Sequence, residues 1–199
     1  IAALTTDQIG ALSTNAVVAL TTAQIRALGS AQIAALTSDQ VPAIELADVL
    51  ALSTRQIAGL TTDQLGRLTN AQFATLSTQH IAALTTRQIA ALTTAQVASF
   101  ANLAPLTSRQ IAALTTDQIA SLALDKITTL RTNQIAGLTS VQVGALTTDQ
   151  IVALSTAQVR SLNAATLAAL STDQVAAVVA VDIAALGTNQ ITTLNSDQL

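Results

Sequence analysis

The sequence predicts an all-α solenoid of very short helices, with one helix for each eight-residue repeat. The main observation is a phrase that is clearest at 84–91 (LTTRQIAA) and 114–121 (LTTDQIAS) and recurs along the chain. Each copy carries a helix-start signal, and its period does not fit one straight helix. The composition agrees, because 50% of the residues are hydrophobic and only Phe73 and Phe100 are aromatic. A narrow, regular interior needs aliphatic side chains of fixed size rather than large rings.

The helix-start signal is a capping box. Counting from the leading Leu, positions two and three are Ser or Thr, position five is Gln and position six is Ile or Val. Thr85 is placed to accept from the backbone N–H of Gln88, while the Gln88 side chain accepts from the N–H of Thr85. Leu84 and Ile89 are spaced as a hydrophobic staple. Three repeats leave open whether some helices begin one residue later: those with Gly29-Ser30, Arg131-Thr132 and Gly187-Thr188.

The eight-residue period excludes a single long helix. A helix turns about 100° per residue, so eight residues overshoot two turns by roughly 80° and the Leu positions would wind around the axis. We therefore expect a helix of about one and a half to two turns, then a corner, in each repeat. Such helices are unstable alone and must bury Leu and Ile or Val against neighbouring repeats. We expect the Ala pair to allow close backbone approach and the polar half to face water.

A β-solenoid is the structural alternative, since short periods also occur in that class. The phrase lacks the alternation of a strand and is rich in Ala and Gln, which strands disfavour. Helices are therefore the favoured interpretation.

Residues 1–199 are predicted to form one octapeptide-repeat solenoid, which we interpret as a segment of a longer array. Pro42 lies inside an expected helix and should break it, and the following repeat, 44–51 (IELADVLA), lacks both hydroxyls. The phase breaks at 100–105 (FANLAP), which has six residues instead of eight. Further degenerate copies begin at Leu122, Leu162 and Val178. A bend or a contact site is expected at such irregularities.

The charged residues do not form a recognisable site. Glu45 and Asp48 lack a partner group for acid–base work. His80 has no second ligand nearby in sequence, and we expect it to replace a surface Gln. In the copies that keep the phrase, seven acids occupy position four, where a negative charge meets the positive end of the helix dipole and Ala, Asn or Arg can replace it; they are Asp7, Asp39, Asp63, Asp117, Asp149, Asp173 and Asp197.

No catalytic, cofactor-binding or metal site is predicted, and no enzyme activity, cofactor or small-molecule substrate is expected. Nucleophile elbows, phosphate loops and dinucleotide fingerprints do not occur. The Thr pairs are explained as helix caps. Matching to an ice lattice, O-linked sugars and hydrogen bonding to a neighbouring solenoid are the alternatives for these hydroxyls.

The low charge limits the classes of partner that the chain is expected to bind. Charged residues are 10% of the chain and the net charge is −3, so no basic face is expected that could neutralise phosphates, and nucleic-acid binding is not expected. A weakly charged surface repels copies of itself poorly, which favours a homo-oligomer or filament. No stretch approaches the roughly 18 apolar residues of a membrane span.

Two resemblances follow from the phrase. Residues 170–177 (LSTDQVAA) resemble the opening helix of the repeats in TAL effectors, Leu-Thr-Pro-x-Gln-Val-Val-Ala, but the second helix and the base-reading loop are missing, so DNA reading is not carried over. The whole chain resembles the LTTxQIAA octapeptide arrays of very large predicted secreted or surface proteins of bacteria. That resemblance implies an extracellular or cell-surface location.

Together these observations predict a structural, non-enzymatic protein that forms an extracellular filament or a cell-surface stalk by self-association. The alternative is an adhesin or scaffold that binds partners through the irregular repeats near Pro42, Phe100 and Val178.

Overall fold

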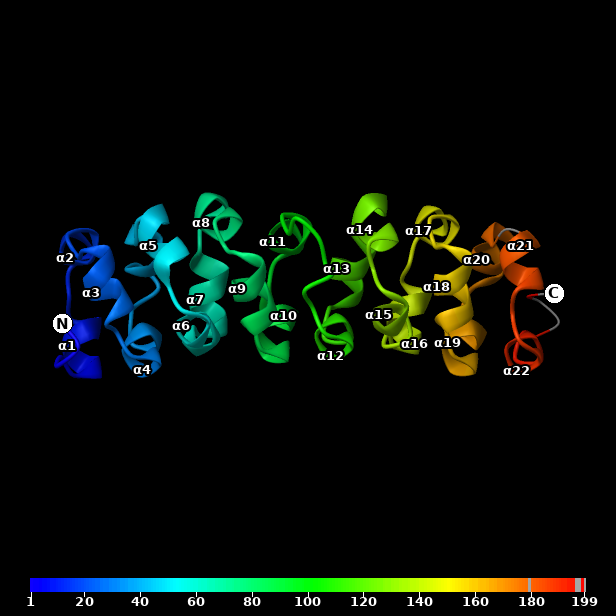
Figure 1. Cartoon of the computed structure of the whole chain (residues 1–199), viewed down its shortest axis with the longest axis horizontal. Coiled ribbons are helices and arrows are strands. Elements are labelled where there is room, and N and C mark those ends of the chain that lie inside the picture. The colour runs from blue at the N-terminus through cyan, green and yellow to red at the C-terminus, as the bar shows by residue number, and fades with distance from the viewer. Residues whose placement is uncertain (179, 196–197, 199) are drawn as a thin grey trace. The chain divides into compact units, whose positions relative to one another are not determined.

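The computed structural model describes residues 1–178, 180–195 and 198, which form 22 short α-helices and one 3-10 helix and contain no strand (Figure 1). The predicted all-α solenoid with one helix per repeat is thus confirmed. The chain divides into two compact units, Ile1–Phe100 and Ala101–Leu199, and the division falls at the start of the predicted phase break. In the first unit the elements are α1 Thr6–Gly10, α2 Thr14–Val18, α3 Thr22–Arg26, α4 Ser30–Ala34, η1 Val41–Ala43, α5 Leu46–Ala51, α6 Thr54–Gly59, α7 Thr62–Arg67, α8 Asn70–Ala74, α9 Thr78–Ala83, α10 Thr86–Ala91 and α11 Thr94–Ala98. In the second unit they are α12 Ser108–Ile111, α13 Thr116–Ala120, α14 Leu124–Thr128, α15 Thr132–Ile135, α16 Ser140–Gly144, α17 Thr148–Val152, α18 Thr156–Ser161, α19 Ala164–Ala168, α20 Thr172–Ala177, α21 Ala180–Ala184 and α22 Thr188–Ile191.

Helix α10 shows how one repeat folds. Thr85 is the N-cap, and its hydroxyl accepts from Gln88 N at 3.2 Å while its own N–H donates to Gln88 Oε1 at 2.8 Å. The helix ends at Ala91, and Leu92 is already extended, with φ −63° and ψ 148°. The corner is therefore made by two extended residues, Leu92 and the next N-cap, Thr93. No described residue has a positive φ, so the corners do not need glycine.

The N-cap lies at position two of the repeat, and this settles the question left open by the sequence. Gly29, Arg131 and Gly187 are N-caps in the same place as the hydroxyl residues, although their side chains make no cap hydrogen bond. The helices have four to six residues, or about 1.1 to 1.7 turns. They are slightly shorter than expected, because the Leu of the next repeat leaves the helix to form the corner.

One turn of the solenoid contains three and a half repeats. Gln64 Nε2 donates to backbone carbonyls that lie 28 and 31 residues earlier, and Gln142 does the same in the second unit. Helices also pack three repeats apart, as α7 does with α10 and α16 with α19. Each helix therefore lies over the corner between two helices of the turn before it.

The core of each unit is made by positions one and six. In the first unit Ile57 and Leu65 are fully buried, and in the second unit Ile111 and Ile119 are fully buried. Leu60, at position one, is 5% exposed. The hydrophobic staple residues thus face the interior, as predicted.

The two aromatic residues replace core aliphatics one turn apart in the first unit. Phe73 stands at position six and Phe100 at position one, and their rings stack with centroids 5.6 Å apart. Phe100 is 4% exposed. The rings therefore fill the core and do not offer a surface contact at the phase break.

In two repeats the glycine at position eight lies directly against the preceding turn. A Cβ at Gly59 would lie 2.7 Å from Ser30 Cβ of the preceding turn, and one at Gly137 would lie 2.8 Å from Ser108 Cβ. Distances this short would require the turns to move apart. Glycine thus allows a close approach of the turns in these two repeats.

The irregular repeats still follow the course of the solenoid. Pro42 prevents an α-helix, as predicted, and residues 41–43 form a 3-10 helix instead. The repeat at 44–51 still forms α5. Between Ala98 and Ser108 the phase break has no helix, and Leu103 and Leu106 are both fully buried there.

Candidate functional site

The main polar feature of the fold is position five of the repeat, which we call the glutamine slot. Gln64 is 2% exposed. Its Oε1 accepts from Thr61 N at 2.8 Å, and its Nε2 donates to Ile33 O at 2.9 Å and Leu36 O at 2.6 Å. The expectation that the Gln side chains face water is therefore wrong.

The glutamine slot supplies donors where the short helices lack them. The last carbonyls of a helix have no partner within it, and a helix of one turn consists largely of such ends. Ile33 and Leu36 flank the corner after α4, and Gln64 of the following turn caps both carbonyls. The Gln64 side chain thus caps the N-terminus of its own helix and also holds its turn of the solenoid to the preceding turn. Equivalent bonds are made by Gln56, Gln72, Gln88, Gln134, Gln142, Gln150, Gln158 and Gln174.

Early in the chain the slot has a different environment. Gln8 and Gln24 form capping boxes but are exposed. These two residues show that the capping role of the slot does not depend on burial, because both form a capping box while exposed.

His80 occupies the glutamine slot and reproduces the Gln pattern. It is 6% exposed, so the expectation of a surface residue is wrong. Ser77 N lies 3.3 Å from Nδ1, and Nε2 lies 2.8 Å from Leu52 O, 28 residues earlier. These neighbours fit the tautomer in which Nδ1 accepts and Nε2 donates. The imidazole therefore has a structural role in the slot.

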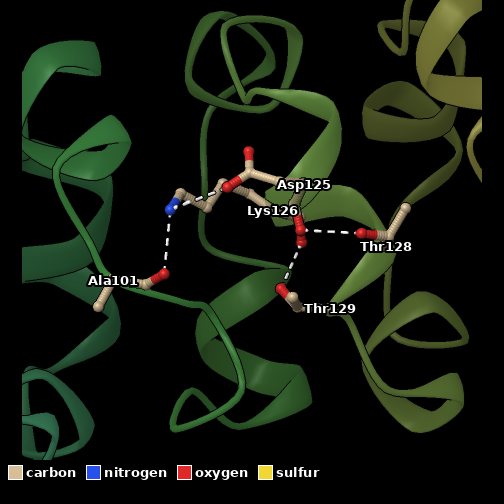
Figure 2. Close-up of polar contacts among 5 residues, drawn as sticks. All are labelled: Ala101, Asp125, Lys126, Thr128 and Thr129. Atoms are coloured by element: carbon tan, nitrogen blue, oxygen red, sulfur yellow. Dashed lines mark hydrogen bonds and ion pairs between the residues drawn. The ribbon is translucent and has the colours of Figure 1, made fainter.

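Lys126 fills the glutamine slot of α14 with a cation (Figure 2). Its Nζ donates to Ala101 O of the preceding turn at 3.0 Å and lies 3.3 Å from Asp125 Oδ2. This is the only ion pair that the structure gives within the described residues. Thr166 also stands in the glutamine slot, but its hydroxyl bonds within its own repeat, where it donates to Asn163 O at 2.8 Å.

The acids at position four lie where the sequence placed them. Five of them are exposed in the first turn of a helix: Asp7, Asp63, Asp117, Asp149 and Asp173. Asp39 is exposed but precedes the 3-10 helix, and Asp197 lies outside the described residues. Asp48 and Asp182 differ from all of these. They stand in the glutamine slot and are 3% and 4% exposed.

In the described part of the chain, no three His, Cys, Asp or Glu side chains are grouped so that they could hold a metal ion. No helix in the same part has the length and apolar character of a membrane span.

Among the described residues, half of the exposed large apolar side chains lie on the irregular repeats. Leu46 and Leu50 on α5 are 47% and 55% exposed, and Leu124 on α14 and Val181 on α21 are 46% and 64% exposed. Val152 on α17 is 53% exposed. The sequence indicated contact patches near Pro42 and Val178, and exposed apolar residues are indeed found close to both positions. Near Phe100 the ring itself is buried.

Comparison with protein families identifies the repeat. The family model of the ALTTAQ repeat matches residues 17–43, 41–78, 70–102, 127–156 and 151–179, which is more than half of the chain. The chain belongs to the ALTTAQ repeat family. The ALTTAQ matches lie on both sides of the phase break and confirm the octapeptide array. The comparison with curated proteins gave no match.

Proposed function

We propose that this ALTTAQ repeat chain is a structural, non-enzymatic protein that forms an extracellular filament or cell-surface stalk of bacteria by self-association. Two properties support the proposal. Each turn is fixed to the one before it by buried side-chain bonds, which suits a load-bearing spacer. The surface carries few charges to keep copies apart, since only 10% of the residues are charged.

The observation that carries self-association is a row of exposed apolar side chains in the second unit. Leu124 and Val152 are 28 residues apart, which is one turn, and α14 contacts α17. Val181 follows one residue after the next full turn. Helices α14, α17 and α21 lie along one edge of this unit (Figure 1). We call Leu124, Val152 and Val181 the apolar row; exposed rows of this kind favour contacts with other surfaces.

The test is a triple Gln substitution of the apolar row. Leu124, Val152 and Val181 each become Gln, and sedimentation velocity and electron microscopy then compare the variant with the parent chain at equal concentration. We expect fibres or large species from the parent and monomers from the variant. Val141 is 71% exposed and lies outside the row, so Val141→Gln is the matched control and should assemble normally. A parent chain that stays monomeric at high concentration would contradict the proposal.

The alternative is an adhesin or scaffold module, and the exposed Leu46 and Leu50 of α5 favour it. Changing both residues to Gln should leave assembly intact if the apolar row acts alone. Loss of attachment to a surface or a partner, with unchanged assembly, would instead assign α5 to binding.

A further inference from the structure

We propose that Asp48 and Asp182 each form a site for a hard metal cation, held between the aspartate carboxylate and backbone carbonyls of the preceding turn. The proposal rests on what the glutamine slot requires. Where a Gln, His or Lys in the slot contacts the preceding turn, it presents an N–H group to a backbone carbonyl there, as seen for Gln64, His80 and Lys126. An ionised aspartate offers only acceptors.

The register identifies the carbonyls at Asp48. Slot residues face the carbonyls 28 and 31 residues earlier, as Gln56 faces Leu28 and Ile25. For Asp48 these are Leu20 and Val17, at the corner between α2 and α3. Helix α5 packs on α3, which places the carboxylate over this corner. For Asp182 the corresponding residues are Leu154 and Ile151 in the second unit.

The Asp48 carboxylate has no partner in the protein. The structure gives it no hydrogen bond and no ion pair with any described residue, and α5 has no capping box. The nearest guanidinium on α3, that of Arg26, donates its Nε to Ala51 O at 3.2 Å. A carboxylate that is 3% exposed and faces carbonyl oxygens is unfavourable without a positive charge between them.

The length of the side chain leaves room for an ion. Gln64 Nε2 lies 2.6 Å from Leu36 O. Aspartate is shorter by one methylene, about 1.5 Å, so its oxygen would lie about 4 Å from the carbonyl oxygen. Oxygens on two sides of a Ca²⁺ ion, each about 2.3–2.6 Å from it, span a similar gap. No fully enclosed side-chain oxygen or nitrogen in the described residues lacks a partner, so the unpartnered carboxylate oxygens of Asp48 keep slight contact with solvent.

Carboxylate and carbonyl oxygens select hard cations. Ca²⁺ tolerates irregular geometry and several carbonyl ligands, whereas Mg²⁺ demands a near-ideal octahedron. With one carboxylate per site, we expect a dissociation constant of about 1 mM, in the range of weak extracellular calcium modules. Lys126 provides the internal comparison, because there the chain supplies its own cation (Figure 2).

The experiment is calcium titration of the chelator-treated full chain in choline chloride, which removes competing sodium and potassium. Calorimetry should give two equivalents of Ca²⁺ for the parent chain, one for Asp48→Gln or Asp182→Gln, and none for the double variant. In 10 mM Ca²⁺ the melting temperature of the parent should rise by about 7 °C, and that of the double variant should not change. Because Gln is the usual residue of the slot, these variants are expected to fold, and circular dichroism checks that they do.

The matched control is Asp63→Asn, which removes an exposed carboxylate of position four and should leave two binding equivalents. The proposal is overturned if the parent chain binds no Ca²⁺ at 10 mM, or if the double variant binds as much as the parent.

Discussion

Helices α5 and α7 lie in the same unit and share their length and their buried core residue, but they differ in their polar bonds. Both have six residues and both are followed by an extended leucine, Leu52 and Leu68. Their core residues, Val49 and Leu65, are fully buried. Helix α7 has a complete capping box and two bonds to the preceding turn, whereas α5 has neither.

This difference separates two kinds of stabilisation. The helix and the corner form in α5 without the polar bonds, so burial at positions one and six is sufficient to shape a repeat. The residue in the glutamine slot adds hydrogen bonds that hold one turn of the solenoid to the next. We therefore expect core substitutions to be costly in both helices and slot substitutions to be costly only in repeats like that of α7.

The largest expected effect is the loss of a core side chain. Leu65→Ala should lower the free energy of unfolding by about 2–5 kcal/mol, because a fully buried leucine leaves a cavity. Val49→Ala should cost about 1–3 kcal/mol, since fewer methyl groups are lost. Urea unfolding followed by circular dichroism measures both. An unchanged stability of Val49→Ala would mean that α5 does not depend on its core residue.

The next effect concerns the slot itself. Gln64→Ala leaves Thr61 N and Leu36 O without their partner, and Ile33 O keeps only its bond from Leu36 N, so the variant should cost about 2–4 kcal/mol. Gln24→Ala removes an exposed capping box and should cost about 0.5–1 kcal/mol. The difference in the free energy of unfolding between the two variants measures how much the bonds between turns contribute to stability.

Gln64→Glu sharpens this test. Glutamate preserves the acceptor that the capping box needs but removes the amide donor and directs a charge at the carbonyls. It should be at least as destabilising as Gln64→Ala. A Glu variant as stable as the parent would show that the bonds to Ile33 and Leu36 contribute nothing.

The repeat was readable from sequence because its signals are local. The capping box of Thr85 and Gln88, the staple of Leu84 and Ile89 and the interruption at Pro42 all act within one repeat, and the structure confirms each of them. The length of the helices was slightly overestimated. The number of repeats per turn was not predictable, because it depends on packing between residues about 28 positions apart.

The burial of the glutamines was missed for a related reason. Their partners are backbone carbonyls, which leave no trace in the sequence. One signal was nevertheless present: a capping box accepts Glu as well as Gln, yet Glu45 is the only glutamate in the chain and none stands at position five. That absence indicates a need for the amide donor. The same logic would have marked Asp48 and Asp182 as exceptions.

The smallest expected effect is the exchange of one donor for another in the slot of α9. His80→Gln should change the free energy of unfolding by less than about 1 kcal/mol, because both side chains accept from Ser77 N and donate to Leu52 O. His80→Leu has similar bulk but no polar atoms, so it should cost about 1–3 kcal/mol through the two groups left unpaired. The two variants are compared by urea unfolding at neutral pH. Equal stability of Leu and Gln at this position would mean that bulk alone fills the slot, and the contrast between α5 and α7 would then reflect core packing only.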